Sequence, residues 1–226
     1  MISELKADIA AKPIMDSGQE LVSLADSGML LDPKYFEWQY SKDPEMKLRE
    51  DALKNLLKAR DILRERVGNA LWNFKIWDCF STLETQRLLF DAYAQDLRKA
   101  HPEWSDDAIE DAVQVFVSFP SFDPDRPAPH NTGGAVDLTI VDENGEELDM
   151  GTEFDEFVEK AHTDFFDDSQ VEAEIEIHKN RMLLKEVMEE AGFVNYSQEW
   201  WHFSYGDQFW AYANEKAHAI YGSKEI

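Results

Sequence analysis

A strand bounded by two turns is the feature that most constrains the fold of this 226-residue chain. Two glycines at 133–134 precede residues 135–141, and an Asn-Gly pair follows at 144–145, so both ends of the segment favour turns with positive φ angles. Side chains alternate between the two faces of a strand. The face that we expect to pack in the core carries Val136, Leu138 and Ile140. The alternation leaves Asp137 on the opposite face.

The remaining periodicity predicts helices and two further strands. Helices are expected over residues 49–67, 83–100, 105 onward, 153–162, 171–191 and 208–221. Strands are expected over residues 72–80 and 199–205. Helices that flank a small, mainly antiparallel sheet make an α+β domain. We expect the whole chain, residues 1–226, to form one such domain, with an irregular N-terminal arm at residues 1–48.

The charge of the chain narrows the class of its partners. It carries 22 Lys and Arg against 47 Asp and Glu, which gives a formal net charge of −25 at pH 7. Because such a surface repels phosphate backbones and anionic lipids, we expect neither nucleic acid nor a membrane as a partner. The N-terminal residues contain no apolar run long enough for a signal sequence, and Cys79 is the only cysteine. We therefore expect a soluble, cytoplasmic protein without an intrachain disulfide.

Two histidines lie in local settings that suggest a metal site. His130 precedes the Gly-Gly turn, which can fold it back toward Asp137. His202 follows Glu199 by three positions, with two tryptophans between them. Two imidazoles and one carboxylate form a recurring ligand set for catalytic zinc, which keeps a fourth position for water and lowers the pKa of that water toward ~7. His130, Asp137 and His202 are therefore candidate ligands and Glu199 a candidate general base. The alternative is two core histidines and an N-capping aspartate.

The pattern leaves two local geometries open. Glu199 and His202 would lie on opposite faces of a regular strand, so either a bulge or a helical turn is needed to bring them together. In the predicted strand 72–80, Asp78 shares a face with apolar residues such as Ile76. A buried carboxylate needs partners, so Asp78 is either a structural hydrogen-bond acceptor or part of a site.

Five segments of the sequence match the motifs of a known family: residues 130–139 (HNTGGAVDLT), 150–155 (MGTEFD), 180–184, 192–193 and 199–203 (EWWHF). In these segments the sequence resembles the D-alanyl-D-alanine dipeptidases, which are zinc peptidases related to D,D-carboxypeptidases. The similarity runs in order through about residues 70–215. It implies an α+β metallopeptidase with its catalytic core there, in which His130, Asp137 and His202 bind Zn²⁺ and Glu199 is the catalytic acid and base.

The resemblance also implies residues that contact substrate. Asp155 matches the family residue that pairs with the free ammonium of the substrate, an arrangement that favours dipeptides over longer chains. Without the resemblance, Asp155 would equally suit the N-terminal cap of a following helix.

Two positions depart from the family pattern. Ser81 stands where the family has an arginine that stabilises the oxyanion, so we expect Ser81 to contact the substrate at this position. Losing one such charged donor typically costs ~10²–10³ in rate. Arg87 or Arg126 could replace that arginine from elsewhere. Two residues before His130, Ala128 stands where the family often has serine.

The function that the resemblance implies is zinc-dependent hydrolysis of D-alanyl-D-alanine or a related small dipeptide. One alternative is a peptidoglycan D,D-carboxypeptidase that acts on the stem peptide. Another is a metal-binding pseudoenzyme or peptide-binding protein, which the loss of arginine at Ser81 suggests. No pattern in the sequence specifies an oligomeric state.

Overall fold

A computed structural model describes residues 2–224, with side chains described for residue 5 and residues 7–224. The helices are α1 (Ile2–Ala10), α2 (Lys34–Glu37), α3 (Glu50–Val67), α4 (Leu83–Ala100), α5 (Asp106–Phe116), α6 (Glu172–Ala191) and α7 (Gln208–Ala213). The strands are β1 (Leu21–Ser23), β2 (Leu30–Leu31), β3 (Lys47–Arg49), β4 (Asn73–Asp78), β5 (Ala135–Val141), β6 (Val194–Asn195) and β7 (His202–Ser204). Two short 3₁₀ helices complete the fold, η1 (Pro129–Thr132) and η2 (Glu159–Ala161).

The main sheet has five strands in the order β2-β4-β5-β7-β6. All neighbours are antiparallel except β2 and β4, and β1 pairs with β3 in a separate two-stranded sheet. The sheet is therefore small, mainly antiparallel and flanked by helices, which confirms the predicted α+β class.

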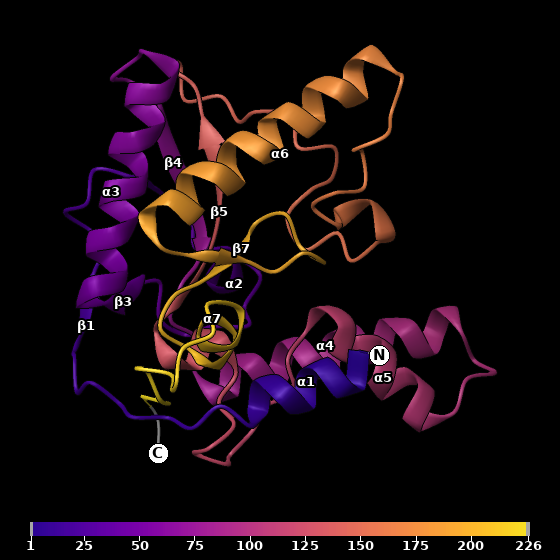
Figure 1. Ribbon diagram of the computed structural model, residues 1–226. Helices are drawn as coiled ribbons and strands as arrows, with labels where there is room; N and C mark the ends of the chain where they lie inside the picture. The colour runs from indigo at the N-terminus through magenta and orange to yellow at the C-terminus, as the bar shows by residue number, and fades with distance from the viewer. Residues whose placement is uncertain (1, 225–226) are drawn as a thin grey trace.

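The predicted core face of β5 is buried. Val136, Leu138 and Ile140 are fully enclosed in one apolar cluster with side chains of α3 and α6, such as Leu56 and Leu184. In Figure 1, α3 and α6 lie against each other beside the sheet, while α4, α5 and α1 are grouped at the other end of the molecule. Helices α4 and α5 enclose a second apolar cluster of their own. The opposite face of β5, which carries Asp137, therefore lies in the space between these two apolar clusters.

Three expectations about local structure need correction. The N-terminal residues 1–48, expected to be irregular, contain two short helices and the strands β1 and β2, and β3 begins at residue 47. The C-terminal helix ends at Ala213 rather than at residue 221, because Glu215 adopts a left-handed φ of 52°. No α-helix covers residues 153–162, where the structure has only η2.

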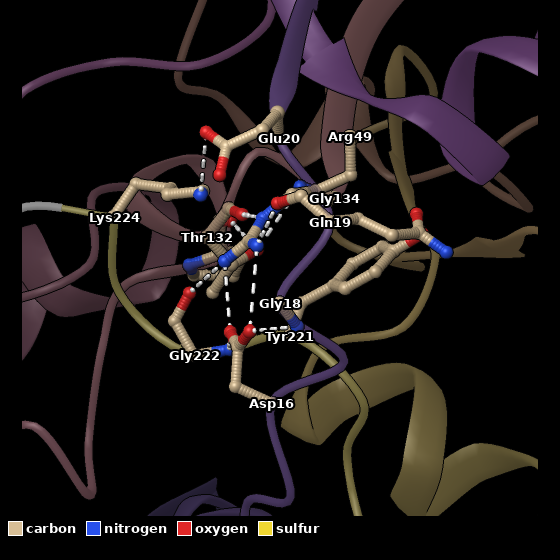
Figure 2. A network of polar contacts seen from close by, with 11 residues as sticks. Asp16, Gly18, Gln19, Glu20, Arg49, Thr132, Gly134, Tyr221, Gly222 and Lys224 are labelled. Atoms are coloured by element: carbon tan, nitrogen blue, oxygen red, sulfur yellow. Dashed lines mark hydrogen bonds and ion pairs between the residues drawn. The ribbon is translucent and has the colours of Figure 1, made fainter.

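A buried arginine ties segments near both ends of the chain to the turn that precedes β5. Arg49, 1% exposed, donates to the backbone carbonyls of Gln19, Thr132 and Gly222 and to the carboxylate of Asp16. Figure 2 shows its guanidinium surrounded by these acceptors. Because a planar guanidinium offers five donors in a fixed fork, it can satisfy four acceptors from three separate segments at once.

In the part of the chain that the structure describes, no helix is both long enough and apolar enough to cross a membrane.

The Arg49 network predicts a large loss of stability when its donors are removed. Arg49→Gln should lower the free energy of unfolding by about 3 kcal/mol, because buried carbonyls and Asp16 lose charged donors. The matched control is Arg66→Gln, since Arg66 pairs with Glu186 and Glu190 on the surface, and should cost about 1 kcal/mol or less. Urea unfolding followed by circular dichroism measures both. Equal losses in the two variants would contradict the structural role of Arg49.

Candidate metal and active site

Strand β5 supplies the centre of the site. Asp137 lies opposite Asp78 of β4 on one side and opposite His202 of β7 on the other. Residues that pair across neighbouring strands project to the same face. Three polar side chains, all buried, therefore stand in a row across the sheet, on the face opposite to the core.

A bulge in β4 places Asp78 in this row. Ile76 pairs with Leu138, but the next recorded pair is Asp78 with Asp137, so Trp77 is an extra residue in the ladder. Regular alternation predicts that Asp78 shares a face with Ile76, and that prediction is wrong. The extra residue turns Asp78 to the side of Asp137, and its carboxylate becomes part of the site.

The Gly-Gly turn carries His130 to the same face, as predicted. His130 lies in η1, which ends at Gly133 with a left-handed φ of 73°. Gly134 passes so close to the carbonyl oxygen of Tyr205 that a Cβ atom there would collide with it. The turn is also held from outside, because the Arg49 backbone N–H donates to the Gly133 carbonyl at 2.8 Å. Glycine is thus required at both positions for different reasons.

The three candidate ligands converge. The Nδ1 atom of His202 lies 2.9 Å from Asp137 Oδ1, and the Nε2 atom of His130 lies 3.2 Å from His202 Nδ1 and 3.4 Å from Asp137 Oδ2. Tetrahedral zinc with bonds of 2.0–2.1 Å separates its ligand atoms by about 3.3 Å. The donor set and its spacing therefore fit one divalent cation.

The charges of the candidate ligands favour the binding of a cation. Burial raises the pKa of Asp137, but the charge of His130 and hydrogen bonds from both histidines lower it to about 2. Burial lowers the pKa of His130, yet Asp137 and Asp78 raise it well above its ordinary value. A divalent cation competes with the proton on His130, so its binding should strengthen as the pH rises.

The histidines are oriented by partners behind them. His130 Nδ1 lies 2.6 Å from the carbonyl oxygen of Cys79 and 3.0 Å from Asp78 Oδ2. On the other histidine, Nε2 lies 3.3 Å from Ser204 Oγ. Such contacts fix the ring orientation and the tautomer of a ligating imidazole. Ser81 extends the first chain, since its hydroxyl donates to Asp78 Oδ1 at 2.8 Å.

Glu199 lies beside the cluster because of a turn, not a strand. Strand β7 begins only at His202, and two successive turns bond Glu199 N–H to Tyr196 and His202 N–H to Glu199. The Asn195 amide donates to the carbonyls of Glu199 and His202, at 3.0 Å each. Glu199 Oε2 consequently lies 3.9 Å from His202 Nδ1. Of the two geometries left open by the sequence, the structure adopts the turn.

Asp155 lies on an irregular segment that Arg181 organises. The Arg181 guanidinium donates to the carbonyls of Met150, Lys160 and His162, and burial lowers its pKa to about 10. Two of these carbonyls, those of Lys160 and His162, lie at the end of the segment 153–162, which is held by turns and by Arg181 rather than by an α-helix. Asp155 itself has a left-handed φ of 58°, which excludes the helix-capping alternative.

No pattern in the sequence indicated which residue would contact Asp155. Tyr35, from the N-terminal residues expected to be irregular, makes a side-chain hydrogen bond to the Asp155 carboxylate. Burial and the charge of Asp137 raise the pKa of Asp155 well above its ordinary value, although the hydrogen bond from Tyr35 lowers it. Both side chains line the same cavity as the metal-ligand candidates.

That cavity has a volume of about 730 Å³ and lies between the sheet and the helices α4 and α5. Residues from α1, the start of α4, the segment 114–130 and α7 complete its walls. Arg126 is on the wall, whereas Arg87 and Ser81 are not among the lining residues that the structure describes. Asp137, His130, His202, Glu199 and Asp155 all face this one space.

A largely buried His-Asp-His set with a glutamate beside it, open to a cavity on an α+β sheet, is the arrangement expected of a metallopeptidase. A family model described as D-ala-D-ala dipeptidase, Peptidase_M15, matches residues 42–220. The chain therefore belongs to this family of D-Ala-D-Ala dipeptidases.

Individual relatives agree with the family model. A D-alanyl-D-alanine dipeptidase of Synechocystis sp. is 29% identical, over 95% of this chain and 96% of that protein. The D-alanyl-D-alanine dipeptidase of Escherichia coli K12 is 46% identical over 74 residues, which cover 33% of this chain and 36% of that protein. Among solved structures, a variant of the vancomycin resistance D,D-pentapeptidase VanY in complex with Zn(II) shares the fold, with a TM-score of 0.51 and 14% identity over 90% of both chains.

The contacts of His130 predict the effect of changing Asp78. Asp78→Asn should weaken zinc binding about 10- to 100-fold, because the ring of His130 loses a charged acceptor behind it. Asp123→Asn is the matched control, since it removes the same charge from the cavity wall without touching a ligand candidate. Competition with a chromophoric chelator measures both affinities. An equal loss in both variants would mean that only net charge matters.

Proposed function

We propose that this chain hydrolyses D-alanyl-D-alanine or a related small dipeptide with the help of zinc. His130, Asp137 and His202 hold the ion, and Glu199 is the general base and acid. The observation that carries the proposal is the convergence of these four side chains at one wall of a cavity, in a chain of the D-Ala-D-Ala dipeptidase family. We place this activity in the cytoplasm, in keeping with a chain that has a single cysteine.

Glu199 is positioned to move the proton of the reaction. When bound, zinc polarises the scissile carbonyl and lowers the pKa of water to about 7. The Glu199 carboxylate, within 4 Å of a ligand atom, takes the proton from the attacking water and delivers it to the leaving amine. The turn held by Asn195 keeps the carboxylate in place for both transfers.

Asp155 and Tyr35 recognise the free ammonium group of the substrate. The half-buried carboxylate of Asp155 at the cavity wall gains a charge-assisted hydrogen bond when an ammonium group binds there. The Tyr35 hydroxyl fixes the orientation of the carboxylate. Fixing the ammonium end sets which peptide bond lies over the metal, and therefore favours dipeptides over longer chains.

The contact of Ser81 with substrate remains a prediction. Its hydroxyl donates to Asp78, and its carbonyl accepts from the Asn131 amide at 2.6 Å. These bonds support a role for Ser81 in holding the Asp78 carboxylate, which in turn orients the ring of His130. Of the two arginines that could replace the missing oxyanion donor, Arg126 is the one on the cavity wall.

The role of Glu199 predicts a loss of turnover with the metal retained. Glu199→Gln should lower kcat/KM for D-alanyl-D-alanine about 10²- to 10⁴-fold, because the amide cannot take a proton. Zinc content, measured by mass spectrometry, should match that of the wild type. Glu172→Gln, on the exposed first turn of α6, is the control and should keep full activity.

If the zinc-loaded wild type hydrolyses neither D-alanyl-D-alanine nor a panel of related D- and L-dipeptides, the proposed activity is wrong. Retained zinc and dipeptide binding without turnover would then support the pseudoenzyme.

Recognition of the ammonium predicts a selective effect at Asp155. Asp155→Asn should lower kcat/KM for the free dipeptide about 10- to 100-fold and change cleavage of its N-acetyl form far less, because only the free form offers an ammonium. Parallel assays of both compounds, and of a D-Ala-D-Ala-ended pentapeptide, measure this. A wild type that prefers the pentapeptide would favour the D,D-carboxypeptidase instead.

A further inference from the structure

The charges on the cavity wall are unequal. Among the lining residues that the structure describes, Arg126 is the single lysine or arginine. The carboxylates on the same wall are Asp78, Asp123, Asp137, Asp155, Glu199 and Asp207. A dipeptide is a zwitterion, so its carboxylate is repelled by most of this wall and attracted at two places, the metal position and Arg126.

We propose that Arg126 binds the terminal carboxylate of the substrate and thereby selects dipeptides with a free carboxyl end. The inference rests on the proposed dipeptidase function and adds to it a residue that determines specificity.

The backbone around Arg126 is fixed. The Gln208 amide donates to the Asp125 carbonyl at 3.0 Å and also to the carbonyls of Ala10 and Lys12, so the segment is tied to α7 and to the end of α1. Arg126 N–H donates to the Asp123 carbonyl at 2.9 Å. Proline follows at positions 127 and 129, immediately before His130, and restricts the backbone further. The guanidinium therefore extends from an anchored point four residues from a metal-ligand candidate.

The guanidinium itself is weakly held. Its ion pair with Asp123 has an Nε to Oδ2 distance of 4.0 Å, and the Arg126 side chain is 68% exposed. Arg49 and Arg181, by contrast, are buried and donate to three backbone carbonyls each. Because a guanidinium pairs with a carboxylate through two parallel hydrogen bonds, Arg126 can leave Asp123 for a substrate carboxylate in better geometry.

The two charged ends of the substrate then contact different parts of the cavity wall. Asp155 and Tyr35 belong to the irregular segment after β5 and to α2, whereas Arg126 belongs to the segment that leads into η1. An extended dipeptide spans only about 7 Å, so a site that reads both charges rejects longer chains at both ends.

The test uses the full-length zinc-loaded protein with D-alanyl-D-alanine and its C-terminal amide. The wild type should prefer the free carboxylate. Arg126→Gln should raise KM for the free dipeptide about ten-fold or more, change kcat less, and leave cleavage of the amide nearly unchanged. Arg126→Lys should restore part of the preference, since lysine keeps the charge without the fork.

The matched control is Arg87→Gln, because Arg87 is exposed, pairs with Asp91 and lies outside the cavity wall. It should leave the preference for carboxylate over amide as in the wild type. A preference that persists in Arg126→Gln, with dipeptide hydrolysis intact, overturns the inference and leaves the proposed function standing. If the wild type hydrolyses no dipeptide, calorimetric binding of the two compounds decides instead. Equal binding of both by wild type and Arg126→Gln, or no binding, overturns the inference as well.

Discussion

The pairing of β5 between β4 and β7 is the constraint on which the site depends. It sets Asp137 beside Asp78 on one strand and His202 on the other, at positions fixed by backbone hydrogen bonds rather than by flexible loops. Strand positions hold side chains within narrow limits, as a metal site requires. The bulge at Trp77 completes the row, since without the extra residue Asp78 would face the core.

Two buried arginines stabilise two irregular segments that lie outside the sheet. Arg49 binds the turn that leads from His130 into β5, and Arg181 binds the segment that carries Asp155. Each donates to carbonyls from at least two stretches of chain that lie outside the sheet. This use of arginine meets the requirement that buried backbone groups be paired, in places where the site needs a shape that neither helix nor strand provides.

The electrostatics of the cavity connect the metal to the substrate. A wall with six carboxylates would be unstable if all were ionised and unpaired, and burial already raises the pKa of Asp78, Asp155 and Asp207. A cation bound at the His-Asp-His set would offset part of this charge, and so would an ammonium group bound at Asp155. The acidity of the wall thus makes the cavity receptive to cationic groups.

The sequence by itself determined the α+β class, the strand at residues 135–141 with its core face, the main helices and the residue types of a His-Asp-His site. These follow from periodicity, turn chemistry and ligand chemistry, which are local properties. Tertiary structure alone decided that Asp78 turns toward Asp137, that Tyr35 meets Asp155, that residues 153–162 remain irregular, and that Glu199 reaches the site from a turn. Each of these features depends on contacts between residues far apart in the chain, such as the β4–β5 register and the bonds from Arg181. Such contacts produce no periodic pattern in the sequence.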